Sequence, residues 1–290
     1  MRVAIVTDSN SGITQEQGRQ AGIYVVPMPF MMAGETYFED ISLTQKSFYE
    51  RLAEGADIST SQPSPASLID LWNELLKDHD AVIHIPMSSG LSSSCETAHA
   101  LAADFGGKVL VVNNQRISVT QRQSVLEAKA MADQGMSAEE IKMVLEETAF
   151  DSTIYITVDT LEYLKKGGRI TPAAALLGTF LKIKPVLTIQ GEKLDAYKKV
   201  RGMKAAKKNM LDAMKKDVEG RFADYVAKGQ LKLHVAYTTD EETAKQWMEE
   251  VQNAFPDLTI TRMDPLSFSI TCHTGPGVLA IAASHALDAE

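Results

Sequence analysis

The sequence predicts an α/β protein built from two domains. From the N-terminus to about residue 150, apolar runs of strand length alternate with segments of helical periodicity, which indicates a parallel sheet covered by helices. After about residue 151, a strand, a tight turn and a second strand replace this alternation and indicate a mixed sheet. The chain of 290 residues is long enough for two ordinary domains with buried cores. We therefore expect an N-terminal α/β domain at 1–150 and a C-terminal α/β domain at 151–290.

Each element of the first half rests on a local signal. Helices are expected where Ser or Thr precedes a periodic segment, most clearly at Ser64, which is followed by Pro65 at the first helical position. Two prolines make residues 23–30 extended rather than helical. In chain order, the expected elements are a strand at 2–7, a helix from Thr14, the extended segment 23–30, helices at 43–55 and 64–78, a strand at 81–86, a helix at 93–103, a strand at 108–112 and two helices before Phe150.

A hairpin at 182–200 is the clearest signal of the second half, because Gln190 and Gly191 provide a tight turn between two strands. The C-terminal segment 277–290 is ambiguous between strand and helix, since Ala favours one and Val and Ile favour the other. The other expected elements are a strand at 152–158, a short helix at 160–166, a long helix from Met203, a strand at 231–238, a helix at 240–255 and a strand at 258–263.

Composition and simple motifs exclude several classes of protein. The net charge of −9 argues against a general nucleic-acid binder. Cys95 and Cys272 lack the spacing of a metal site and the six histidines are scattered, so we expect no metal. The sequence has neither a GxGxxG motif nor a Walker loop, which argues against nucleotide binding. No run approaches the roughly 18 apolar residues of a membrane span, and the N-terminus lacks the pattern of a signal peptide. We expect a cytoplasmic protein with no integral membrane segment.

Four polar loops are candidates for a binding site, at 7–12, 59–64, 88–94 and 272–277. Ligands of open α/β sheets bind beyond the carboxyl ends of strands, on loops that lead into helices. Hydroxyl groups and the free N–H groups of a helix N-terminus together can bind an anion. Ordinary turn and N-cap chemistry uses the same residue types, so both interpretations stay open for any one loop.

Six separated motifs, taken together, carry a resemblance to a known family. They are "TDSNSGIT" near the start, "TSQPS" at 60–64, "SSGLSSS" at 88–94, "LEYLKKGGRI" at 161–170, "KPVLTIQGEKL" at 184–194 and "HTGPG" at 273–277. Their order is that of the DegV family, which is similar to the fatty-acid-binding subunits of bacterial fatty acid kinases. The chain resembles this family over essentially its whole length. It departs from the family pattern where Ser93, Ser94 and Cys95 stand in place of the usual Gly-Thr-Tyr.

The resemblance implies a two-domain α/β fold that holds one long-chain fatty acid between its domains, with the acyl tail buried in the second. The carboxylate would bind at Thr60 and Ser92, with Ser61 and Ser93 around it and His273 beside it. The chain would have no cofactor and would not itself be an enzyme. It would present the carboxylate to the catalytic subunit of a fatty acid kinase, which would form the acyl phosphate.

The residue chemistry suits such a ligand, although each part has a simpler interpretation. Hydroxyl donors suit a carboxylate, and charge-assisted hydrogen bonds contribute roughly 1.5–3 kcal/mol each. A buried acyl tail gains about 0.8 kcal/mol for each CH₂. Apolar material for the tail is available in Phe30, Met31 and Met32, at 176–181 and at 265–270, and each stretch taken alone also suits a plain core.

A serine hydrolase or acyltransferase is the main alternative function. Ser92 would act as nucleophile and His273 as base, with Asp8 to orient the histidine. The segment "GLSSS" resembles the G-x-S-x-G nucleophile motif but has Ser94 in place of the second Gly. The motif is therefore incomplete.

A basic segment indicates a partner. Between Lys182 and Lys216 there are eleven Lys and Arg residues against three Asp and Glu, a local excess of +8 on an acidic chain. A solvated helix face would explain this excess equally well. As a docking surface it would attract an acidic kinase. We expect Arg201 and Lys204 to belong to such a surface; Arg169 belongs either to it or to the domain junction.

Overall fold

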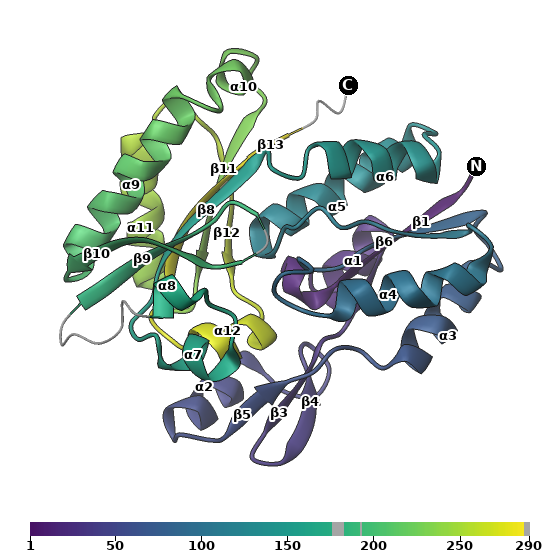
Figure 1. Ribbon diagram of the computed structural model, residues 1–290, viewed down its shortest axis with the longest axis horizontal. Helices are drawn as coiled ribbons and strands as arrows, with labels where there is room; N and C mark the ends of the chain where they lie inside the picture. Colours follow the sequence, from purple (N-terminus) through teal and green to yellow (C-terminus); the bar gives the residue numbers. More distant parts are fainter. Residues whose placement is uncertain (176–182, 192, 287–290) are drawn as a thin grey trace. The chain divides into compact units, whose positions relative to one another are not determined.

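The computed structural model describes residues 1–175, 183–191 and 193–286, and most of their elements are labelled in Figure 1. The chain divides into two compact units. Unit 1 contains Met1–Ala149 and a later segment, Ser267–Cys272, and unit 2 contains the other described residues. The sequence pattern predicts one boundary near residue 150, whereas the segment Ser267–Cys272 returns to the first unit.

A four-stranded sheet forms the centre of unit 1, and all of its strands are parallel, as predicted. Its order is β2-β1-β6-β7, so β1 and β6 are neighbours. The strands are β1 (Val3–Asp8), β2 (Ile23–Val26), β6 (Ala81–Ile85) and β7 (Val109–Val111). The helices that alternate with them are α1 (Gln15–Ala21), α3 (Pro65–Leu75), α4 (Ser94–Ala102), α5 (Ser118–Asp133) and α6 (Ala138–Glu147), with short 3₁₀ turns η1 (Ser9–Ser11) and η2 (Ala103–Phe105).

Local capping explains why several of these helices begin where they do. Thr14 accepts a hydrogen bond from Gln17 N in a capping box at the start of α1. Ser64 accepts from Ser67 N at the start of α3, and Pro65 follows at the first helical position. On one face of the sheet, Trp72 of α3 and Ala98 of α4 belong to one buried cluster that also contains strand residues.

Unit 1 also contains a three-stranded antiparallel sheet that the sequence patterns do not predict. Its order is β4-β3-β5, formed by β3 (Pro29–Met32), β4 (Glu35–Phe38) and β5 (Ile58–Thr60), with α2 (Gln45–Ala53) between β4 and β5 in the chain. The extended segment 23–30 is therefore divided between two sheets, since β2 ends at Val26 and β3 begins at Pro29. Pro27 lies at this division and cannot donate a backbone hydrogen bond.

The returning segment of unit 1 carries most of α12 (Phe268–Thr274). The ring of Phe268 stacks on that of Phe48, with centroids 4.4 Å apart. The backbone N–H of Phe268 donates to the Glu39 carboxylate at 3.0 Å. Ser267 Oγ donates to Asn10 Oδ1 at 2.8 Å. These contacts join the segment Ser267–Cys272 to the first sixty residues of the chain.

Unit 2 is built on a mixed six-stranded sheet, which confirms the predicted class of this half. Its order is β10-β9-β8-β13-β11-β12, and only the β11/β12 pair is parallel. The strands are β8 (Ser152–Thr157), β9 (Ile183–Ile189), β10 (Asp195–Arg201), β11 (Leu231–Tyr237), β12 (Ile260–Pro265) and β13 (Leu279–His285). The helices are α7 (Glu162–Gly167), α8 (Pro172–Ala175), α9 (Met203–Glu219), α10 (Ala223–Ala227) and α11 (Glu241–Ala254).

Strand β13 resolves the ambiguity of the C-terminal segment as far as the structure describes it. It lies between β8 and β11, and each of its residues from Leu279 to His285 is buried. Helices α9 and α11 pack on one face of the sheet through Met210 and Trp247, in a cluster that includes Ile281. A strand that is buried on both faces needs no alternation of polar and apolar residues, which explains the apolar run from Leu279 to Ala283.

Candidate functional site

Asp8, at the end of β1, holds two strand ends of unit 1 together. Its carboxylate accepts hydrogen bonds from Met87 N at 2.8 Å, Asn10 N at 3.0 Å and Gln121 Nε2 at 3.3 Å. Burial raises the pKa of Asp8 to about 6, and these three bonds oppose that rise. Both oxygens therefore serve unit 1 itself.

The loop after β6 places Ser92 directly before α4. Ser92 N donates to Ser88 O at 3.2 Å, which closes one turn, and Ser92 Oγ accepts from Ser94 N at 3.2 Å. Ser92 is half-buried, whereas Ser93 is exposed. Ser93 occupies the N-cap position of α4, but its side chain makes no capping hydrogen bond. Ser93 therefore does not cap this helix with its side chain.

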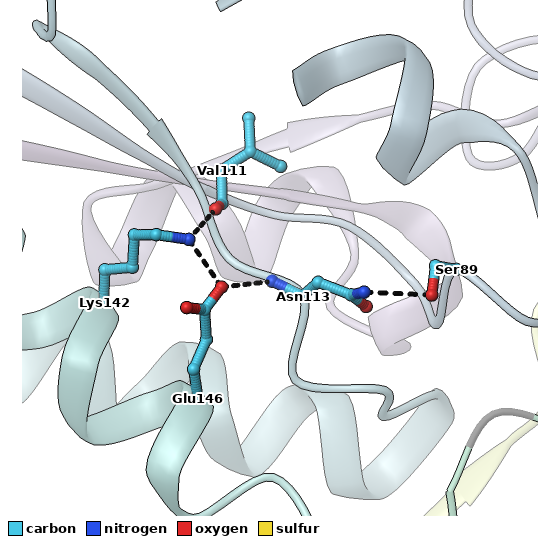
Figure 2. Close-up of polar contacts among 5 residues, drawn as sticks. All are labelled: Ser89, Val111, Asn113, Lys142 and Glu146. Atoms are coloured by element: carbon cyan, nitrogen blue, oxygen red, sulfur yellow. Dashed lines mark hydrogen bonds and ion pairs between the residues drawn. The ribbon is translucent and has the colours of Figure 1, made fainter. Parts of the chain in front are cut away.

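A hydrogen bond from Asn113 to Ser89 also holds the loop after β6. Figure 2 shows Asn113, which follows β7, donating from Nδ2 to Ser89 Oγ at 3.0 Å. The backbone N–H of Asn113 donates to Glu146 Oε1 at 3.0 Å. Lys142 binds the same Glu146 oxygen and also donates to Val111 O, at 2.6 Å. Helix α6 thus fixes Asn113, and Asn113 in turn orients the loop that leads to Ser92.

Thr60 is the last residue of β5 and pairs with Phe30 of β3. Thr60 is half-buried, and Ser61 next to it is exposed. Gln62 then joins this loop to the one after β6. Its Oε1 accepts from Ser93 Oγ at 3.2 Å and from Thr97 Oγ1 at 3.0 Å. The two hydroxyl loops that carry Thr60 and Ser92 are therefore tied together within unit 1.

His273 lies in unit 2, close to the end of α7. A Cβ atom at Gly167 would collide with His273 Nδ1, so the absence of a side chain at Gly167 makes room for the imidazole. Burial, and then the positive charge of Arg169, lower the pKa of His273 to about 4. Arg169 Nη1 in turn donates to Gly167 O. His273 is therefore neutral at pH 7 and can donate one hydrogen bond.

The glycines of "HTGPG" pack against the segment that contains α7. Gly275 has φ +73° and faces the ring of Tyr163 so closely that a Cβ atom would collide with it. Gly277 has φ +81° and lies equally close to the Asp159 carboxylate. Thr238 fixes the loop by donating from Oγ1 to Gly275 O at 2.8 Å. Two motifs separated by about a hundred residues therefore meet in unit 2.

The four polar loops do not all occupy the position predicted for them. The loops at 7–12 and 88–94 follow the neighbouring parallel strands β1 and β6, as expected. The loop at 59–64 instead follows a strand of the antiparallel sheet, and the loop at 272–277 begins inside α12. The rule for open parallel sheets therefore applies to two of the four.

The remaining predicted residues have varied surroundings. Phe30 and Met32 are fully buried, while Met31 is 37% exposed, and the apolar stretch 176–181 lies outside the described residues. Arg201, at the end of β10, and Lys204, in the first turn of α9, are both exposed. Sequence reasoning missed two contributors, Gln62 and Asn113. Only the position of Gln62 inside the "TSQPS" motif could have indicated it.

Unit 1, with a parallel sheet and hydroxyl-bearing loops, and unit 2, with a mixed sheet, define an α/β protein of two different halves. The model of the DegV family, described as an uncharacterised protein, matches residues 2–286. The chain therefore belongs to the DegV family. Within the described residues, no helix is long and apolar enough to cross a membrane.

Relatives and solved structures match this chain along nearly its whole length. Protein DegV of Bacillus subtilis is 32% identical over 97% of this chain and 98% of its own, and a DegV domain-containing protein of Deinococcus radiodurans is 31% identical over the same shares. A DegV family protein from Thermus thermophilus, whose structure is described as showing fatty acid binding, matches with a TM-score of 0.88 and 33% identity over 98% of this chain and 100% of its own. The B. subtilis structure, described as a fatty acid binding protein, matches with a TM-score of 0.85 and 31% identity over 98% and 99%.

Proposed function

We propose that this chain binds one long-chain fatty acid through the hydroxyl groups of Thr60 and Ser92. The observation that carries the proposal is that Gln62 ties the loop of Thr60 to that of Ser92, so that two hydroxyl donors are held in one unit. The fatty acid binding described for the T. thermophilus and B. subtilis relatives supports the same ligand. Ser61 and Ser93 are the exposed neighbours of these donors, and both belong to the proposed head-group region.

The acyl tail would supply most of the binding free energy. Two charge-assisted hydrogen bonds contribute roughly 1.5–3 kcal/mol each, whereas a buried tail of about 14–18 carbons supplies around 10 kcal/mol gross. His273 is proposed as a further hydrogen-bonding residue for the ligand. Its neutral imidazole can donate to a carboxylate without a charge of its own.

We further propose that the bound carboxylate is presented to a partner kinase, which would form the acyl phosphate. Arg201 and Lys204 are proposed to bind that partner. Both are exposed, and neither forms an ion pair with any residue that the structure describes. By contrast, Lys207 pairs with Glu250 and Lys208 with Asp212. Unpaired cations are the ones that remain available to an acidic partner.

The chemistry of the proposed site is unfavourable for a serine hydrolase. A general base works best when its pKa lies near the working pH, and that of His273 is lowered to about 4. Asp8, the group expected to orient such a base, is occupied by donors from Met87, Asn10 and Gln121. These observations weigh against hydrolysis as the activity of this chain.

The proposal is tested on delipidated protein with wild type, Thr60→Ala and Ser92→Ala measured side by side. Each substitution removes one donor, and we expect a loss of about 1–3 kcal/mol in binding a C16 or C18 fatty acid. The double variant should lose less than the sum, because both donors serve one anion. Wild-type affinity in both single variants would place the carboxylate elsewhere. Cleavage of p-nitrophenyl esters that disappears in Ser92→Ala would establish the hydrolase instead.

A further inference from the structure

We propose that Gln62 is a positioning residue for the head group: it sets the spacing of the Thr60 and Ser92 loops and thereby the preference for a carboxylic acid. The inference rests on the proposed function and adds to it a residue that would not touch the ligand. The side chain of Gln62 is half-buried, and its amide oxygen accepts from two hydroxyls, those of Ser93 at the N-cap of α4 and of Thr97 within α4.

The backbone around Gln62 is fixed on both sides. Before it, Ser61 N donates to Pro29 O at 3.3 Å, which continues the pairing of β5 with β3. After it, Pro63 is buried and restricts Gln62 to an extended conformation. Ser64 then caps α3 by accepting from Ser67 N at 3.1 Å. The side chain of Gln62 is thus presented from a short link that has little freedom of its own.

The partners of Gln62 lie on one face of α4, immediately after Ser92. Ser93 and Thr97 are four residues apart and therefore project from the same side of the helix. The hydroxyl of Ser93 would ordinarily accept a bond from a backbone N–H of the first turn. It makes no such bond and donates to Gln62 at 3.2 Å instead. The serine at the start of α4 is therefore used to join two loops rather than to cap a helix.

The contact between Gln62 and α4 also determines where Ser92 lies. Ser92 Oγ accepts from Ser94 N, so the position of its hydroxyl follows the first turn of α4. Thr97 N donates to Ser93 O in that turn. A shift of α4 away from Gln62 would move Ser92 relative to Thr60. Two donors that converge on one carboxylate depend on this separation, whereas a buried acyl tail does not.

A neutral amide is the side chain that this position requires. Its oxygen satisfies two hydroxyl donors without adding a negative charge close to a bound carboxylate. A leucine of similar size would leave both hydroxyls without this acceptor. The inference therefore predicts a specific defect in acid recognition when the link is broken from either side.

The experiment compares hexadecanoic acid with 1-hexadecanol, which has the same tail but lacks the carboxylate. On delipidated full-length protein, Gln62→Leu and Thr97→Val should each weaken binding of the acid about tenfold, equivalent to about 1.4 kcal/mol. Binding of the alcohol should stay within about twofold of wild type. The double variant should bind the acid no worse than Gln62→Leu alone, because that substitution already removes the contact with Thr97. Thr97→Ser is the matched control, since it keeps the hydroxyl and should bind the acid like wild type.

Two kinds of result overturn the inference. Equal weakening of acid and alcohol would show that Gln62 serves only the stability of unit 1. Unchanged binding of the acid in Gln62→Leu, or in a folded Thr97→Val if Gln62→Leu does not fold, would show that the link does not position the donors. If the wild-type protein itself does not bind the acid more tightly than the alcohol, the proposed function is wrong. The inference about Gln62 is then wrong as well.

Discussion

Glu39 provides a prediction of how the stability of unit 1 depends on pH. One oxygen of its buried carboxyl accepts from Phe268 N at 3.0 Å, and the other, Oε2, makes no hydrogen bond to a described residue. Burial raises the pKa of Glu39 from 4.5 to about 8, and the neighbouring charge of Asp40 acts in the same direction. The folded protein therefore favours the neutral carboxyl.

Because the pKa of Glu39 is raised in the folded protein, the stability of the folded protein should fall as the pH rises. Stabilisation by the neutral carboxyl is fully present below pH 4.5 and is lost as the pH rises through about 8. The loss is about 1.4 kcal/mol per pH unit within that window, and at most about 5 kcal/mol across all of it. Glu39→Gln keeps an oxygen that can accept from Phe268 N but cannot ionise. It should therefore remove this part of the pH dependence and stabilise the protein most at pH 8 and above.

The assay is urea unfolding of wild type and Glu39→Gln at each pH from 5 to 9, followed by the fluorescence of the tryptophans. Trp72 lies in the core of unit 1 and reports on the relevant half. Asp40→Asn is the matched control, because it removes the adjacent exposed charge and should change the wild-type curve only slightly. Parallel stability curves for wild type and Glu39→Gln across this range would refute the reasoning.

Two further predictions concern unit 2. Replacing Arg201 and Lys204 by Glu should weaken phosphorylation of the bound fatty acid by the partner kinase. The affinity for the fatty acid should stay unchanged, because surface charges are screened over about 8–10 Å. A fall in that affinity would assign these residues to the ligand instead. Gly167→Ala should lower the melting temperature and fatty-acid affinity, because its Cβ would displace His273. Gly168→Ala is the control for backbone strain, because Gly168 has a φ of +67° but a Cβ atom there would meet no atom within 4 Å. If the clash with His273 is the cause, Gly167→Ala should lower the melting temperature only slightly in a His273→Ala background.

Much of the fold could be predicted because its signals are local. The helix starts at Thr14 and Ser64 depend on hydrogen bonds within three residues. Strands β9 and β10 form the predicted antiparallel hairpin, although their connection runs from residue 190 to 194 and is longer than the expected turn at Gln190 and Gly191. Buried strands such as β6 are recognisable because both of their faces are covered. These elements required no knowledge of distant contacts.

Other features depend on contacts between distant residues, and local patterns could not reveal them. The extended segment 23–30 was recognisable, but its division between β2 and β3 depends on strands far along the chain. The return of Ser267–Cys272 to unit 1 depends on its contacts with Asn10 and Glu39.

The candidate site shows the same limit. The residue types of Thr60 and Ser92 predicted an anion site, and the strand that leads into the loop of Ser92 is visible in the sequence, whereas β5, which ends at Thr60, is not. The bond between Gln62 and Thr97 joins residues 35 positions apart, and that between Asn113 and Ser89 joins residues 24 apart. Only the folded chain brings these pairs together, so the positioning of the donors could not be foreseen.

The central claim is that this chain carries a fatty acid, and the most direct measurement is the lipid content of the purified protein. Denaturing extraction followed by mass spectrometry, together with the intact mass under native conditions, gives both the identity and the stoichiometry of any ligand. We expect one long-chain fatty acid per chain, with reduced occupancy in the Thr60→Ala, Ser92→Ala double variant. Protein that contains no fatty acid, and that takes up none when delipidated and offered a C16 or C18 acid, would contradict the claim.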